Sequence, residues 1–165
     1  MAKMSQTKSK AEYKRSPKAP SIARVSGVEK LYYVSLLGLK TSRTQELITQ
    51  IKRGLAYTAW ESFIRNTDFR KEEAVGLVQI TARTLSRRKE EGRLQPDESD
   101  RLVRAARILG HALDLFEGDK ESARGWLMTS QPALGGSTPL EYATTDVGAR
   151  EVEALIGRLE HGIPS

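Results

Sequence analysis

The chain has 165 residues, of which 38% are hydrophobic; it carries a formal net charge of +6 and contains no cysteine. The hydrophobic content is normal for a soluble globular protein. The lack of cysteine excludes disulfides and thiolate metal sites and fits a cytoplasmic location. No stretch approaches the about 18 uninterrupted apolar residues of a transmembrane helix, and the basic N-terminus lacks the apolar segment of a secretory signal.

The positive charge is concentrated at the N-terminus. Residues 1–24 hold seven basic residues against Glu12, and the rest of the chain carries 20 basic and 20 acidic residues. Within that remainder, residues 81–107 have a net charge of +3 and residues 114–160 have a net charge of −5. The middle of the chain therefore suits a polyanionic partner, and the C-terminal part does not.

Residues 1–24 are rich in Lys, Ser, Ala and Pro and have almost no large apolar side chains. This composition predicts a basic arm that is disordered when free, because it cannot bury enough apolar surface to fold. Two roles fit the arm about equally well. It adds non-specific affinity for DNA, or it only keeps the chain in solution.

Residues 25–55 form a segment whose pattern is harder to interpret than that of the helices that follow. The pattern of Leu31–Gly38 is ambiguous between a helix and a short strand around Tyr32–Leu36. The second half predicts a helix that is capped by Thr41 or Ser42 and stopped by Gly54. The apolar side of that helix is formed by Leu47, Ile48 and Ile51.

Four helices are predicted over residues 56–116, each with an apolar side for burial. They cover residues 57 to about 67, 70 to 78, 81 or 82 to 91, and 96 to about 115. The residues expected to face inward are Tyr57, Trp60, Phe63, Ile64, Ala74, Val78, Leu85, Leu102, Ala105, Ala106, Leu109, Ala112, Leu113 and Phe116.

The segment Lys71–Glu90 has the shape of a helix-turn-helix, in which the second helix enters the major groove of DNA. Arginines on its outer face match guanine O6 and N7, and hydroxyl side chains suit phosphates or base edges. Gln79 stands where the turn often needs a glycine with positive φ, so a looser or longer turn is expected. The alternative is that the basic stretch is only a solvated helix face. The predicted DNA-binding residues are Thr81, Arg83, Thr84, Ser86, Arg87, Arg88, Lys89 and Arg93.

The C-terminal part predicts three more helices with explicit start and stop signals. Asp119 caps the first, and Thr138-Pro-Leu-Glu141 opens the second with a capping box and a proline at the first helical position. Thr145 opens the third, which Gly162 and Pro164 stop. The helices opened by Thr138 and Thr145 are too small a pair to bury their own apolar side. This side must pack on the preceding helices, on another protein or on both. That side consists of Val152, Leu155, Ile156 and Leu159.

No catalytic, metal or cofactor site is predicted. His111 and His161 are not at ligand spacing from each other, and the carboxylates of residues 97–100 lie in a first helical turn, where they favour the helix dipole. Gly135-Gly136 lacks the following lysine and the strand–helix context of a phosphate-binding loop. We therefore expect a protein that acts by binding and not as an enzyme.

Several blocks occur in an order that resembles the Xre/MbcA/ParS family of bacterial antitoxins. They are Lys71–Val78 with the turn that follows, Arg83–Glu90, the helix start Pro96–Leu102, Pro132–Leu140 and the ending Glu160-His-Gly162. The resemblance runs from about Arg53 to Ser165, roughly two-thirds of the chain.

The resemblance implies an all-α fold. A central Xre/Cro-like helix-turn-helix domain is expected over residues 56–116 and a small helical toxin-binding domain over residues 117–165, after the basic arm of residues 1–24. Related antitoxins dimerise, and residues 25–55 are the candidate for a share of that interface. The alternative for this segment is that it only covers the core of its own subunit.

The resemblance also implies partners. The usual partner of the family is a RES-domain toxin that consumes NAD or modifies a protein with it, and the C-terminal domain of the antitoxin covers the active site of the toxin. A homodimer, a higher-order complex with the toxin and repression of the chain's own operon through operator DNA are expected. The predicted toxin contacts are Leu134, Gly135, Gly136, Thr138, Pro139, Leu140, Arg150, Arg158, Glu160, His161, Gly162, Ile163, Pro164 and Ser165.

Other interpretations remain open at this stage. A plain turn explains Gly135-Gly136, and a cation near exposed helix carbonyls explains His161. The chain as a whole also fits a stand-alone helix-turn-helix transcription regulator whose last module binds a small effector or mediates oligomerisation, or an adaptor that binds protein without DNA. A toxin gene beside the gene for this chain would separate the antitoxin from these alternatives.

Overall fold

The computed structural model describes residues 32–41 and 43–163, which form helices and connecting turns with no strand among them. This confirms the predicted all-α fold, while the predicted basic arm lies outside the described residues. The elements in chain order are η2 (Tyr32–Leu37), α1 (Thr44–Arg53), α2 (Tyr57–Thr67), α3 (Lys71–Val78), α4 (Ala82–Glu91), α5 (Pro96–Leu115), α6 (Lys120–Leu127), η3 (Pro132–Leu134), α7 (Pro139–Tyr142) and α8 (Asp146–Glu160).

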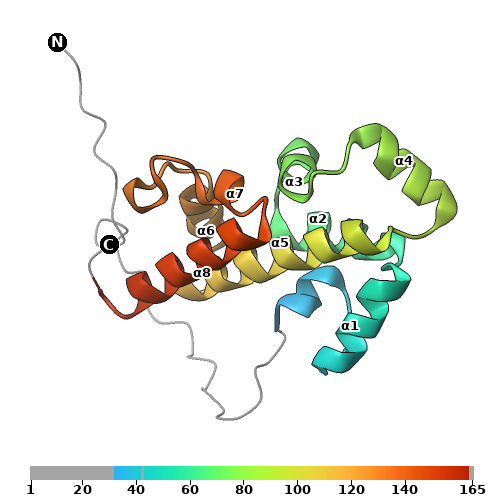
Figure 1. The fold of residues 1–165 in the computed structure, drawn as a ribbon, viewed down its shortest axis with the longest axis horizontal. Helices are drawn as coiled ribbons and strands as arrows, with labels where there is room; N and C mark the ends of the chain where they lie inside the picture. The colour runs from blue at the N-terminus through green and yellow to red at the C-terminus, as the bar shows by residue number, and fades with distance from the viewer. Residues whose placement is uncertain (1–31, 42, 164–165) are drawn as a thin grey trace.

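One helix, α5, connects the two halves of the molecule. It contacts η2, α1, α2 and α3 from the N-terminal half and α6 and α8 from the C-terminal half. Figure 1 shows α5 running through the middle, with α3 and α4 beyond one side and α8 lying along its other end. A single hydrophobic cluster contains buried side chains from η2 through α8. The proposed domain boundary after Phe116 thus falls at the end of a helix that serves both parts.

The sequence of α5 explains its length and its burial. Pro96 occupies the first helical turn, and the carboxylate of Glu98 accepts a hydrogen bond from the backbone N–H of Gln95 at 2.8 Å, which forms the capping box. The helix ends where Glu117 and Gly118 take positive φ values of 55° and 87°. Its buried residues are not confined to one stripe, because the helix packs against neighbours on more than one side. They include Leu102, Val103, Ala105, Ala106, Ile108, Leu109 and Ala112.

The ambiguous piece near the N-terminus is a 3-10 helix, Tyr32–Leu37, and not a strand. Its two buried residues, Val34 and Leu37, are three positions apart. A 3-10 helix has three residues per turn and places both on one side, whereas the two-residue period of a strand would place them on opposite faces. The possible strand around residues 32–36 is therefore excluded.

The start of α1 also differs from the prediction. The residue before the helix is Arg43, whose side chain makes no capping hydrogen bond. Thr41, one of the two predicted caps, instead donates a hydrogen bond to the carboxylate of Glu46 at 2.7 Å, and Ser42 lies outside the described residues. The predicted stop at Gly54 is confirmed, with a positive φ of 80°.

The next three helices follow the prediction closely. The bounds of α2, α3 and α4 agree within one residue, and Trp60, Phe63, Ala74, Val78 and Leu85 are buried as expected. The rings of Trp60 and Phe63 lie 6.4 Å apart between centroids, a separation at which aromatic pairs contribute beyond their buried area. This aromatic pair anchors α2 in the core.

The C-terminal helices begin at the predicted caps. The Asp119 carboxylate accepts hydrogen bonds from the first turn of α6, Thr138 and Glu141 form a capping box on α7, and the Thr145 hydroxyl accepts from Gly148 N–H at 3.0 Å. The apolar side of α8 packs on α5, and three of its four predicted members are fully buried. They are Val152, Leu155 and Ile156.

Gly148 sits at the tightest point between α7 and α8. A Cβ atom added there would lie 1.8 Å from the carbonyl oxygen of Tyr142, which is backbone and cannot move away cheaply. We expect Gly148→Ala to lower the free energy of unfolding by about 1–3 kcal/mol, because the corner between the helices must open. Urea denaturation followed by circular dichroism measures this loss.

Gly157 supplies the matched control in the same helix. No atom lies within 4 Å of a Cβ added there, so Gly157→Ala should raise stability by about 0.5–1 kcal/mol through the better helix propensity of alanine. Equal effects of the two substitutions would contradict the close approach of α7 to α8.

Candidate functional site

The helix-turn-helix consists of α3, a three-residue connection and α4. Gln79 takes the left-handed conformation, with φ 53° and ψ 44°, and its N–H donates to the carbonyl of Val75. The turn therefore has the positive φ that the motif requires, although a non-glycine residue provides it at a cost of about 1–2 kcal/mol. A longer connection is not needed, because Thr81 directly caps α4 by accepting from Thr84 N–H at 3.1 Å.

The outer face of α4 carries most of the predicted DNA-binding side chains. Among the described residues, Arg87 forms one long ion pair, with Glu91 at 3.8 Å, and this pair is largely exposed, which leaves the guanidinium available to a ligand. Thr84 is half-buried and has its backbone N–H and hydroxyl engaged with Thr81. The exposed members of the predicted set are Thr81, Arg83, Ser86, Arg87, Lys89 and Arg93.

Arg88 does not belong to that face. It is only 7% exposed, and its Nε donates to both carboxylate oxygens of Glu98 at 3.1 and 2.8 Å. A terminal nitrogen of the guanidinium donates to Glu91 at 2.6 Å. The expectation that Arg88 faces outward is wrong, because position 88 lies one helical turn after the buried Leu85 and shares its side.

Arg93 is exposed but its guanidinium has an internal role. It donates to the carbonyl oxygens of Arg53 and Gly54, the orphan acceptors at the end of α1. The backbone of Arg93 also forms an antiparallel bridge with Ala56. The guanidinium of Arg93 therefore has partners inside the chain, and the predicted contact with DNA would have to share it with them.

An ion pair joins the helix-turn-helix to the C-terminal half. Arg124 of α6 donates to the Glu73 carboxylate of α3 from Nε at 3.1 Å and from Nη2 at 2.6 Å, and Arg70 donates to the same group. These hydrogen bonds, with Arg124 as the largest contributor, lower the pKa of Glu73 to about 2. A second pair, Lys120 with Asp68 at 3.4 Å, bridges the same two regions.

The predicted toxin contacts fall into two groups. Leu134 and Pro139 are buried in the chain's own core, so the expectation that their side chains meet a partner is wrong. The loop between them turns at Gly135 and Gly136, whose positive φ values support a plain turn. The remaining described members are exposed or half-buried: Gly135, Gly136, Thr138, Leu140, Arg150, Arg158, Glu160, His161, Gly162 and Ile163, while Pro164 and Ser165 lie outside the described residues.

Sequence reasoning missed two exposed apolar side chains at the corner between α7 and α8. Val147 is 74% exposed and Tyr142 is 38% exposed. The sequence does contain a signal for Val147. The apolar side of α8, formed by Val152, Leu155 and Ile156, extends towards the N-terminus through Gly148 and Ala149, and position 147 does not lie on it. Exposed apolar groups of this kind mark surfaces that bind partners when they are clustered.

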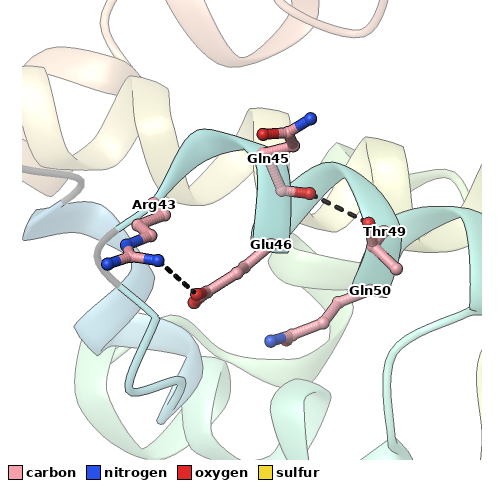
Figure 2. A pocket seen from close by; sticks show the side chains of 5 residues that line it. All are labelled: Arg43, Gln45, Glu46, Thr49 and Gln50. Carbon is pink, nitrogen blue, oxygen red and sulfur yellow. Dashed lines mark hydrogen bonds and ion pairs between the residues drawn. The ribbon is translucent and has the colours of Figure 1, made fainter.

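A shallow hollow lies on the outer side of α1. It is lined by polar side chains of that helix and of the residue before it, and Figure 2 shows the long ion pair between Arg43 and Glu46 at its rim. Thr49 closes part of it by donating to the carbonyl of Gln45. The hollow is open to solvent, and its walls offer no buried group for a ligand.

Over residues 32–41 and 43–163, no helix has the length and apolar character that a membrane span requires. The same residues contain no group of three or more His, Cys, Asp or Glu that could hold a metal ion.

The arrangement defines a class: a DNA-binding protein with a helix-turn-helix and an attached helical partner-binding module. The model of the antitoxin Xre-like helix-turn-helix domain matches residues 46–107, and that of the antitoxin Xre/MbcA/ParS C-terminal toxin-binding domain matches residues 111–162. With the relatives described next, these matches show that the chain belongs to the Xre family of antitoxins.

Three similar proteins carry the name antitoxin Xre. The one from Yersinia enterocolitica is 39% identical over 128 residues, which cover 77% of this chain and 86% of the relative. The one from Photorhabdus laumondii is 36% identical over 130 residues, covering 78% and 88% respectively. A third, from Pseudomonas putida, is 37% identical over 84 residues, about half of each chain. The resemblance to this family in the sequence is thereby confirmed.

Proposed function

We propose that this antitoxin neutralises a RES-domain toxin that consumes NAD, and that it does so by covering the active site of the toxin with its C-terminal end. The observation that carries the proposal is the exposed end of α8 within the matched toxin-binding domain. Glu160, His161 and Gly162 are exposed there and take no part in the core, and Ile163, the next residue after the match, is exposed as well. An end of this kind is free to enter a pocket of a partner.

Charge supports the same proposal. Residues 114–160 have a net charge of −5, and Glu151 and Glu160 are exposed without an ion pair among the described residues. A pocket that binds an anionic dinucleotide is expected to be basic. An acidic cap would complement that pocket and exclude the substrate, which is an inhibition by binding that requires no catalysis.

The DNA-binding half supports autoregulation. The protein is proposed to act in the cytoplasm as a homodimer that binds repeated half-sites in its own promoter through α4 and represses the operon. Residues 25–55 are proposed to share in the dimer interface. Ile48, on α1, is 46% exposed, and burial of this side chain against a second subunit would remove that apolar surface from water.

Co-expression tests the antitoxin proposal directly. The chain should restore growth and the NAD level of cells that express the RES-domain protein encoded beside it, and the two proteins should co-purify as a complex. Normal binding to the promoter together with no complex and no protection would contradict neutralisation. That result would favour the stand-alone transcription regulator.

A further inference from the structure

We propose that Arg88 is a positioning residue of the DNA-binding helix: it fixes the orientation of α4 so that Arg83 and Arg87 reach DNA, and it makes no DNA contact itself. The proposal rests on DNA binding through α4, and it assigns a role to an arginine that the sequence groups with the base readers. The geometry of the Arg88–Glu98 pair carries it.

The carboxylate of Glu98 is shared between two helices. It accepts two hydrogen bonds from Nε of Arg88 and one from the backbone N–H of Gln95, where it closes the capping box of α5. The side chains of Arg88 and Glu98 are only 8% and 6% exposed. One buried carboxylate therefore ties the second turn of α4 to the first turn of α5.

This tie matters because α4 has few other attachments. Figure 1 shows α4 at the edge of the molecule, beyond the end of α5. Within α4 only Leu85 and Arg88 are buried, and they are one turn apart on the inner side. Two anchors on one side fix both the position of the helix axis and the rotation about it. An apolar contact at Leu85 alone would leave the position of the axis and the rotation about it less restricted, since dispersion contacts have no preferred direction.

The rotation of α4 about its own axis decides which of its side chains can contact the bases of DNA. Consecutive residues in an α-helix are separated by about 100°, so the direction of Arg87 follows from that of Arg88. Hydrogen bonds weaken steeply when their angle is poor, and a rotated α4 would misalign the donors of Arg83 and Arg87 together. A buried ion pair often adds little net stability compared with a hydrophobic pair, which leaves orientation as the main benefit of this one.

A double-mutant cycle tests the assignment. The variants are Arg88→Met, Glu98→Gln and the two combined; glutamine keeps an acceptor for the Gln95 cap, and the combination removes both buried charges. The probe is a duplex of the promoter immediately upstream of the gene, compared with a shuffled duplex of equal length, at a temperature where circular dichroism shows each variant folded.

We expect each single variant to lower the preference for the promoter duplex about tenfold, and the combined variant to lower it no further than either single change, because all three remove the same tie. The dependence of affinity on salt should be unchanged in all three. Lys89→Met, a change of the exposed neighbour, should instead reduce the salt slope by about 0.9 if that lysine neutralises one phosphate.

A native preference for the promoter duplex in Glu98→Gln, together with a loss in Arg88→Met, would overturn the assignment, because the Arg88 side chain would then act on DNA without its tie to α5. If Arg88→Met alone does not fold, Glu98→Gln and the combined variant still decide the question. Amide hydrogen exchange in the free protein is a measurement without DNA: the two single variants and the combined variant should all speed exchange in α4 to a similar extent. If the native chain shows no preference for the promoter duplex, the proposed autoregulation is refuted. The hydrogen-exchange measurement then decides whether Arg88 positions α4.

Discussion

Replacing Arg83 and Arg87 together with alanine is expected to abolish sequence-specific DNA binding and to leave the fold intact. Both residues are exposed on the outer face of α4, and the single ion pair of Arg87 is long and solvated. Each lost base contact should cost about 1–3 kcal/mol of specific binding. Footprinting of the chain's own promoter measures the loss, and circular dichroism measures the fold.

The control is an exposed cation away from α4. Lys52, on α1, is exposed as well, and Lys52→Ala should leave the footprint unchanged. Deleting residues 2–24 should have a third outcome, a weaker salt dependence with the sequence preference retained, because these residues supply charge and no base-reading element. A normal footprint from the double arginine variant would show that α4 is not the reading helix.

A chain that ends at Gln131 is expected to lose toxin binding and protection completely. It lacks α7 and α8, and the segment from residue 132 onward that contains them makes up more than half of the matched toxin-binding domain. From sequence alone, α5 should still close the remaining core. The structure adds a cost, since Val152, Leu155 and Ile156 of α8 are buried against the rest of the chain. Removing them should also lower the melting temperature of the helix-turn-helix, which a thermal scan detects.

A smaller cut separates the loss of toxin contact from the loss of stability. Removing only residues 161–165 should leave the melting temperature unchanged, because the described residues of that end are exposed. Protection from the toxin should weaken more than complex formation, as measured by growth and pull-down. Glu160→Lys should weaken the complex, and Glu61→Lys, on α2, should not. Full protection by the chain that ends at Gln131 would refute the capping assignment.

The parts of the fold that were predictable are those with local signals. Pro96 with Glu98, and Thr138 with Glu141, mark helix starts within four residues of sequence, and these starts are confirmed. The segment around Thr41 was not predictable in the same way. A hydroxyl before a helix suggests a cap, but α1 begins only at Thr44, and Thr41 donates to the Glu46 side chain in its first turn instead.

The sequence predicted the candidate site as a group of basic residues on one helix, but not the role of each residue in that group. The pattern Arg87-Arg88-Lys89 places basic residues on a helix without showing which of them has a partner elsewhere. The partner of Arg88 is ten positions away on another helix, and buried arginines are rare unless they are paired. Burial of Leu134 escaped prediction for a similar reason, because the short helix η3 that contains it packs against α8, a later element of the chain.

The central helix α5 limits how related antitoxins can exchange domains by recombination. The two family matches end at residue 107 and begin again at residue 111, and the residues between them are Ile108, Leu109 and Gly110, all buried in the middle of α5. A recombination event at that boundary would join two half-helices whose packing surfaces belong to different ancestors. One inserted residue there would turn everything downstream by about 100°. New toxin specificity is therefore easier to acquire by substitution along α7 and α8 than by shuffling whole domains.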